Sequence, residues 1–238
     1  MASLNDGAQM NLEELKQDPV SALNSYCVLV SQTRWRMDLH ERLIKQRKTC
    51  FSTPSEAADS DAFVADLYDI LTAWYGSRAW LLIDLDDRFR VAVKRAAAQL
   101  DYLKDLRIEN IGPSQVDCIT ETLWRVIHNL SITKGKAKVV SETKAIHHFV
   151  PDLIPPMDVR YTGKFFWKHG EIGQVKRQRS IFRLIFRVFI DLAQCISTNS
   201  EFMACVGTGF HTSLPKALDN AIIGFVDRNF GEQPTTCA

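Results

Sequence analysis

The segment from Gln178 to Ile196 is apolar around most of its helical circumference, and this feature constrains the fold more than any other. A helix that lacks a polar face is stable only when other elements cover it on most sides. We therefore expect this segment to be the central helix of a multi-helix core. A chain of 238 residues, 46% of them apolar, is long enough to build such a core.

Apolar residues recur at helical spacing along most of the remaining chain. Stripes of this kind predict helices over residues 63–74, 89–103, 116–130, 139–150 and 214–226. Start and stop signals flank them, with Ser60 and Ser213 as N-caps and Pro151 after the fourth stripe. No alternating run of six residues predicts a strand, and residues 26–30 are compatible with either a buried strand or a helix. The fold class is therefore all-α, as a compact multi-helix domain.

The domain organisation is predicted from the one stretch without periodicity. Residues 51–60 are rich in Ser, Pro and acidic residues, which is typical of a surface loop. This loop would separate an N-terminal helical segment, residues 1–50, from a main helical domain, residues 61–238, within one cooperative unit.

Composition excludes several classes of protein. No apolar stretch approaches the ~18 residues of a transmembrane helix, so we expect no membrane partner. The N-terminus carries Asp6 and Glu13 and lacks the apolar segment of a signal peptide, so we expect a cytoplasmic protein, or a nuclear one in a eukaryote. The six cysteines form no CxxC pair, which favours reduced thiols and predicts no metal site. The lone Gly207-Thr-Gly209 is typical of a turn, and no cofactor is expected.

Charge is distributed unevenly along the chain, although the formal net charge is only +1. Residues 55–87 are acid-rich, whereas residues 134–187 hold twelve basic residues against four acidic ones. A basic stretch of this kind is typical of a polyanion binder, and its pairing with an acidic stretch is typical of a protein-interaction module. We therefore expect DNA or RNA as the partner of a non-catalytic binding domain, with a protein-interaction or scaffold module as the alternative.

The candidate nucleic-acid contacts all lie in the basic stretch. They are Lys134, Gly135, Lys136, Lys138, Lys144, Arg160, Lys164, Arg179 and Arg183. The two arginines recur every four residues together with Arg187, so they form one cationic row on a helix. Such a row predicts either phosphate contacts or the solvated edge of a buried helix.

Two adjacent histidines interrupt the stripe over residues 139–150. On a helix, His147 and His148 point about 100° apart, so they cannot bind one metal ion as an i, i+4 pair. His147 falls on the apolar stripe and is expected to be a hydrogen-bonded core residue. His148 is expected to be more exposed, where it could transfer a proton or contact a phosphate.

The segment from Lys134 to Tyr161 combines a basic turn with glycine, an amphipathic helix, a proline-rich turn and Asp158. This order resembles the core of the helix-hairpin-helix DNA glycosylases, with Gly135 at the hairpin and Asp158 twenty residues after Lys138. It departs from that pattern in having one glycine in the hairpin and Arg160 where a histidine is usual. The segment is also similar to helical proteins without an established activity that carry a TKxxHHxxPDLxPPMDxxYT-type motif.

The glycosylase resemblance implies a degenerate helix-hairpin-helix element around residues 130–165 and a second alternative function. Asp158 would be the catalytic carboxylate of a glycosylase or lyase, and Lys138 or Lys136 would lie beside the bound DNA strand. A pocket for an extruded base would then have aromatic walls, for which the candidates are Trp124, Tyr161, Phe165 and Trp167. The residue pattern alone equally predicts Asp158 to be the N-cap of the following helix.

Overall fold

The computed structural model describes residues 4–31, 36–167, 172 and 175–231, and its fold is all-α. Within these residues twelve α-helices follow one another, and the only β pairing is an isolated bridge between Leu82 and Thr133. The helices are α1 (Asp6–Gln17), α2 (Pro19–Ser31), α3 (Met37–Cys50), α4 (Pro54–Asp59), α5 (Asp61–Tyr75), α6 (Asp87–Leu100), α7 (Pro113–Leu130), α8 (Val139–Phe149), α9 (Tyr161–Phe166), α10 (Gln178–Ile196), α11 (Ser200–Cys205) and α12 (Leu214–Phe230). Short 3-10 helices include η1 (Gly76–Leu81), which follows α5.

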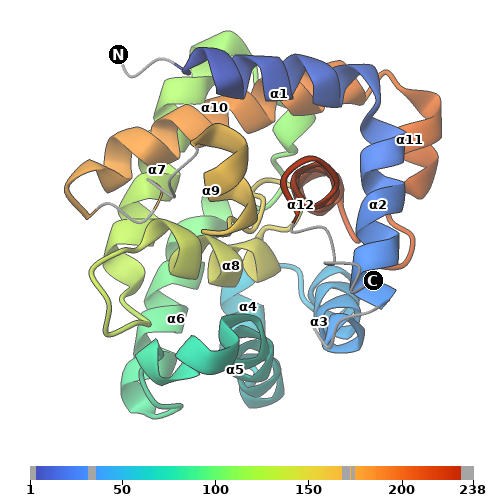
Figure 1. Cartoon of the computed structure of the whole chain (residues 1–238). Coiled ribbons are helices and arrows are strands. Elements are labelled where there is room, and N and C mark those ends of the chain that lie inside the picture. The colour runs from blue at the N-terminus through green and yellow to red at the C-terminus, as the bar shows by residue number, and fades with distance from the viewer. Residues whose placement is uncertain (1–3, 32–35, 168–171, 173–174, 232–238) are drawn as a thin grey trace, which may run out of the picture.

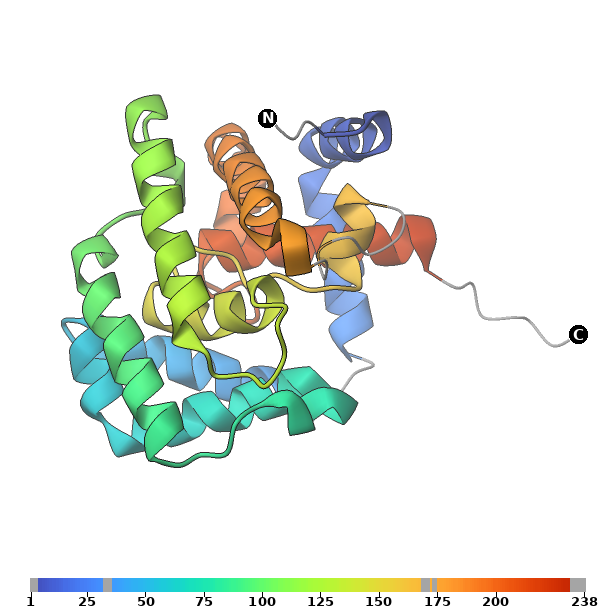
Figure 2. The ribbon, with the colours of Figure 1, turned by 90° about the vertical axis from the view of Figure 1, so that its left-hand side faces the viewer.

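Two helices occupy the interior. Figure 1 shows α12 end-on near the centre, with α2, α9 and α10 around it, and these helices contact α12. In the other half of the molecule α8 contacts α3, α5, α6 and α7. Figure 2 shows α12 crossing the interior while α7 and α10 stand side by side at one face.

The position of the central helix differs from the expectation. Every residue of α12 from Leu214 to Val226 is buried, as are ten of the eleven residues of α8, whereas α10 exposes one edge. The reason is that the polar side chains of α8 and α12 are largely hydrogen-bonded or ion-paired inside the protein, which lowers the cost of burying them. The arginines of α10 remain at the surface, opposite the acidic residues of α7.

A glycine sets the close packing of α12 on α2. A Cβ atom added to Gly224 would lie only 2.0 Å from the carbonyl oxygen of Ala22 and 2.7 Å from the amide nitrogen of Tyr26. Only glycine therefore allows the two backbones to approach to this distance. On the same side of α12, the ring centroid of Tyr26 lies 5.8 Å from Nζ of Lys216.

The region predicted as a surface loop, residues 51–60, contains helix α4. Thr53 and Glu56 form a reciprocal capping box at its start, and Pro54 stands in the first turn. Ala57 and Ala58 are buried against the core. The loop prediction was wrong because Ser, Thr, Pro and Glu at these positions start a helix, and the helix is too short to show a stripe.

The two predicted serine caps agree with the structure. Ser60 and Ser213 cap α5 and α12, and residues 26–30 belong to α2 rather than to a strand. One hydrophobic core cluster contains side chains both from residues 1–50 and from residues 61–238. Among the helices described, none is long and apolar enough to cross a membrane.

The chain between α7 and α8 lies beside η1. The amide of Lys134 donates to the carbonyl of Leu81 at 2.7 Å, and the amide of Ile83 donates to Ile132 at 3.0 Å. Loop 131–138 therefore shares one edge of the molecule with η1, next to the site described below.

Candidate functional site

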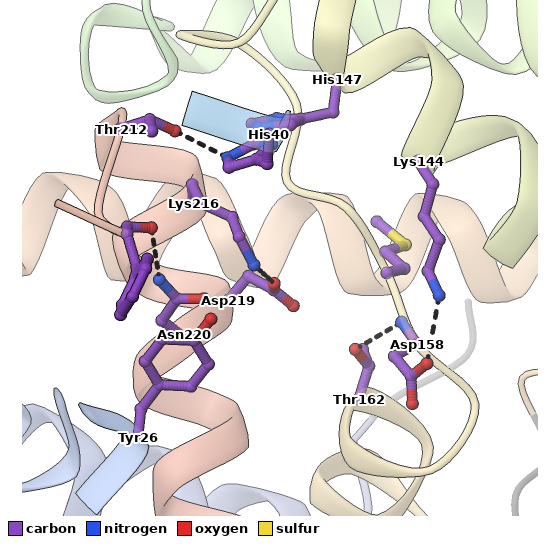
Figure 3. Close-up of polar contacts among 12 residues, drawn as sticks. Tyr26, His40, Lys144, His147, Asp158, Thr162, Thr212, Lys216, Asp219 and Asn220 are labelled. Carbon is purple, nitrogen blue, oxygen red and sulfur yellow. Dashed lines mark hydrogen bonds and ion pairs between the residues drawn. The ribbon is translucent and has the colours of Figure 1, made fainter. Parts of the chain in front are cut away.

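A pocket of about 240 Å³ with charged and aromatic side chains in its lining lies between the two interior helices. Charged side chains reach it from α8 and α12, from the loop before α9 and from η1, and aromatic side chains reach it from α2, α5 and α9. Its lining residues are Tyr26, Met37, Trp74, Arg78, Lys144, Pro156, Asp158, Arg160, Tyr161, Lys216, Asp219 and Ile223. Figure 3 shows Lys216 and Asp219 of α12 facing Lys144 and Asp158 from the opposite side.

The first ion pair joins α8 to the loop before α9. Lys144, only 8% exposed, places its Nζ 3.3 Å from Oδ2 of Asp158. Oδ1 of Asp158 accepts hydrogen bonds from the amides of Arg160 at 2.6 Å and Tyr161 at 3.2 Å. Burial alone would raise the pKa of the Asp158 carboxyl, but Lys144 and the two amides outweigh it and lower that pKa. Asp158 is therefore an ionised carboxylate that accepts hydrogen bonds from the two amides at the start of α9 and lines the pocket.

The second ion pair lies on one turn of α12. Lys216 Nζ is 2.7 Å from Oδ2 of Asp219, and the two residues are 4% and 3% exposed. Oδ1 of Asp219 is buried and accepts no hydrogen bond from any described residue. Burial raises the pKa of the Asp219 carboxyl, and Lys216 opposes that rise. A buried carboxylate oxygen without a donor is costly, so its position in the lining of a pocket points to a ligand.

Both ammonium groups lie near the ring of Trp74. The Nζ atoms of Lys144 and Lys216 are 6.0 Å and 5.5 Å from the centroid of that ring. The Lys216 Nζ is also 5.8 Å from the ring centroid of Tyr26. Cations at these distances are attracted by the negative face of an aromatic ring, which helps to hold two desolvated ammonium groups in one small pocket.

Two exposed arginines stand at the mouth of the pocket. Arg78 belongs to η1, and Arg160 is the last residue before α9. The Arg160 guanidinium lies 5.3 Å from the ring centroid of Tyr161. Neither arginine has a carboxylate partner within the part of the chain that the structure describes, so the mouth carries excess positive charge, whereas the charges of the two interior pairs balance.

A chain of buried histidines lies behind Lys144. The Nδ1 of His148 is 2.8 Å from the carbonyl oxygen of Lys144, so it carries the proton and Nε2 is an acceptor. His40 donates from Nδ1 to that Nε2 at 3.1 Å, and its own Nε2 accepts from the hydroxyl of Thr212 at 2.9 Å. Burial lowers the pKa of His148 to about 4 and that of His40 well below its usual value. Both rings are therefore neutral, and the chain supports the backbone of α8 at the pocket.

The structure corrects the expectation for His148 and agrees with that for His147. His148 is completely buried, and its hydrogen-bond partners are His40 of α3 and the carbonyl oxygen of Lys144. His147 is buried as well and donates from Nδ1 to the carbonyl of Ile154 at 2.7 Å. Among the described residues no three His, Cys, Asp or Glu side chains are arranged to hold a metal ion.

The predicted catalytic pair, Asp158 and Lys138, is not brought together as an ion pair. Lys138 Nζ instead lies 3.3 Å from Glu142, one turn further along α8, and Lys144 takes the place beside Asp158. Lys134 is exposed, and its Nζ donates to the carbonyl of Trp80 at 3.2 Å. Lys136 is exposed on the same loop, where a Cβ atom added to Gly135 would meet no other atom within 4 Å.

The arginine row of α10 faces the acidic residues of α7. Arg179 pairs with Glu121 at 2.9 Å, and Arg183 pairs with Asp117 at 3.2 Å. Arg187 also pairs with Asp117. These guanidinium groups are partly neutralised by their partners. Lys164 is exposed on α9 and lines a different groove, together with α1, while Lys168 of the basic stretch lies outside the described residues.

Of the four aromatic candidates for a pocket wall, only Tyr161 lines the pocket. Trp124 packs towards Phe182 of α10, and Phe165 and Trp167 border the groove beside α1. Sequence reasoning missed the side chains of α2, α5, η1 and α12, namely Tyr26, Trp74, Arg78, Lys216 and Asp219. One signal was available, because two charged residues three positions apart interrupt an otherwise apolar helix over residues 214–226.

Comparison with known proteins adds no relative: no family model, curated protein or solved structure matches the chain. The case for function therefore comes from the geometry of the pocket and its surroundings.

Proposed function

We propose that the protein binds single-stranded nucleic acid at the mouth of the pocket. The observation that carries the proposal is the pair of arginines, Arg78 and Arg160, without carboxylate partners among the described residues, beside an exposed tryptophan. Trp80 is 68% exposed and stands two residues after Arg78 on η1. Unpaired guanidinium groups suit phosphates, and an exposed indole ring suits the stacking of an unpaired base.

Loop 131–138 adds further positive charge to the same edge. Lys134 is held against Trp80 by its hydrogen bond, and Lys136 is exposed on the same loop. In contrast, the arginines of α10 are engaged with Asp117 and Glu121. We therefore expect loop 131–138 and Arg160 to contact the strand, and we expect the arginines of α10 to stabilise the packing of α10 beside α7.

The test is a fluorescence-anisotropy titration of a labelled single strand of about 15 nucleotides, and of the matching duplex, at several salt concentrations. Removing two phosphate contacts in an Arg78→Ala/Arg160→Ala variant should reduce the slope of log affinity against log salt by about 1.4. A Trp80→Ala variant should weaken binding to the single strand by roughly 5-fold to 150-fold, which corresponds to ~1–3 kcal/mol of stacking.

Arg183→Ala is the matched control, because it also removes one arginine, but one that has a carboxylate partner. We expect its affinity to equal that of the unmodified protein within about twofold. The proposal fails if no strand binds at low salt, or if Arg183→Ala loses as much affinity as the mouth variant.

A base-excision activity is the second candidate, and the position of Asp158 in the pocket favours it. An ionised carboxylate at that place could stabilise the positive charge that develops on a sugar when its base departs. This activity predicts base release or scission of a damaged strand by the unmodified protein and none by Asp158→Asn. Equal rates for the two proteins would exclude Asp158 as the catalyst.

A further inference from the structure

The floor of the pocket presents two kinds of hydrogen-bonding group to a ligand. The ammonium groups of Lys144 and Lys216 are donors with protons to spare after their ion pairs. Oδ1 of Asp219 is an acceptor that receives no hydrogen bond from the described residues. In Figure 3 the Asp219 carboxylate lies between Lys216 and Lys144, and all three residues line the same pocket.

This arrangement excludes several ligand groups from the floor. A phosphate would face the carboxylates of Asp158 and Asp219, so it belongs at the mouth with Arg78 and Arg160. A cationic amine would face two ammonium groups. The group that fits is neutral and carries one N–H donor flanked by two acceptors. The volume of about 240 Å³ is below the ~300–1,000 Å³ of most ligand pockets, so the group is small.

We propose that the pocket binds the imide edge of uracil or thymine, with the ring N–H donated to Asp219 Oδ1 and the two flanking carbonyls accepting from Lys144 and Lys216. The inference rests on the proposed function, because it takes the ligand from the bases of a bound strand. Trp74 and Tyr26 supply the aromatic surface against which a planar ring packs. Cytosine and adenine lack the ring N–H, and each presents an amino group towards one of the ammonium groups.

The experiment measures the binding of nucleosides to the whole chain by ligand-observed NMR, with uridine, N3-methyluridine, cytidine and adenosine as probes. We expect uridine to bind at least about fivefold more tightly than each of the other three, which is the lower end of discrimination by paired hydrogen bonds. The Asp219→Asn variant keeps the size of the side chain and removes its negative charge. In that variant the preference for uridine over cytidine should fall at least about threefold.

A matched control is Asp152→Asn, which removes a carboxylate that pairs with Lys48 and does not line the pocket. It should keep the preference for uridine. Circular dichroism checks that both variants are folded. If Asp219→Asn does not fold, the unmodified protein is tested with uridine and N3-methyluridine, which differ only in the ring N–H and its methyl replacement. Equal affinities for these two nucleosides would then overturn the inference.

The outcomes separate the inference from the proposed function. Equal affinities for all four nucleosides would mean that the sugar or non-specific contact governs binding, and would overturn the inference even if strands bind in a salt-dependent way. A uridine preference that Asp219→Asn leaves intact would overturn it too. A uridine preference that depends on Asp219, without any binding of strands, would support the imide site for a free nucleoside and refute the proposed function.

Discussion

Acid should destabilise the protein through the buried histidine chain, and His148 is the residue that tests this idea. Its ring is completely buried and is hydrogen-bonded at both nitrogens, to Lys144 and His40, in the neutral form. Burial lowers the pKa of His148 to about 4, whereas an unfolded histidine titrates near ~6.5. The native state therefore binds fewer protons than the unfolded state between these two values. The contribution of the neutral His148 ring to the free energy of unfolding is fully present above pH ~6.5 and is lost as the pH falls towards 4.

The size of this effect follows from the difference in pKa. A difference of about two and a half units corresponds to about 3 kcal/mol in the free energy of unfolding, most of it lost between pH ~6.5 and ~4.5. Glu142 acts in the opposite direction, because burial raises its pKa to about 7 and its contribution declines as the pH rises. That contribution is present in the unmodified protein and in the variant, so it cancels when the two are compared.

The assay is urea unfolding, followed by circular dichroism, at several pH values between about 7.5 and 4.5. His148→Gln removes the titrating ring, so its loss of stability over this range should be smaller than that of the unmodified protein by about 2–3 kcal/mol. His128→Gln is the control, because His128 is exposed, and it should follow the unmodified protein. The reasoning is refuted if His148→Gln loses stability with acid as steeply as the unmodified protein does.

Three further predictions concern stability and are checked by urea unfolding. Gly224→Ala should destabilise the protein by about 1–3 kcal/mol or more, since the new methyl group meets the backbone of α2; Gly135→Ala, with open space around it, should change stability by less than about 0.5 kcal/mol. Lys216→Met should cost about 3–5 kcal/mol at neutral pH, because it leaves the buried Asp219 carboxyl without its ion-pair partner, and Lys216→Met/Asp219→Leu should recover part of that loss. Thr53→Ala should cost about 1 kcal/mol by removing the cap of α4, and an unchanged midpoint would argue against the capping box.

The resemblance of residues 134–161 to the helix-hairpin-helix glycosylases remains a prediction. Its central residue, Asp158, lines the pocket and accepts hydrogen bonds from the amides of Arg160 and Tyr161, whereas the N-cap of α9 is Arg160. Sequence spacing pointed to Lys138 or Lys136 as its partner. The partner is Lys144, because Asp158 returns beside the middle of α8 rather than beside its start.

Local signals determined the helices of this protein. The spacing of apolar residues and the caps at Ser60 and Ser213 act within one or two turns of chain, so they can be interpreted without knowing the fold. The same reasoning fails at α4, where a helix of six residues has caps but no room for a stripe.

Only the tertiary structure decided which helices lie in the interior and where the pocket forms. The sequence of α10 is apolar around most of its circumference, yet α8 and α12 are the buried helices. Lys144 and His148 of α8 find partners on other elements, and Lys216 pairs with Asp219 on α12 itself beside the ring of Trp74. The pocket unites Tyr26, Trp74, Asp158 and Asp219, which are spread over nearly two hundred positions of the chain. The free-energy cost of burying a charge depends on the groups that surround it in the folded protein. Many of those groups are distant in the sequence, so no local sequence pattern predicts this cost.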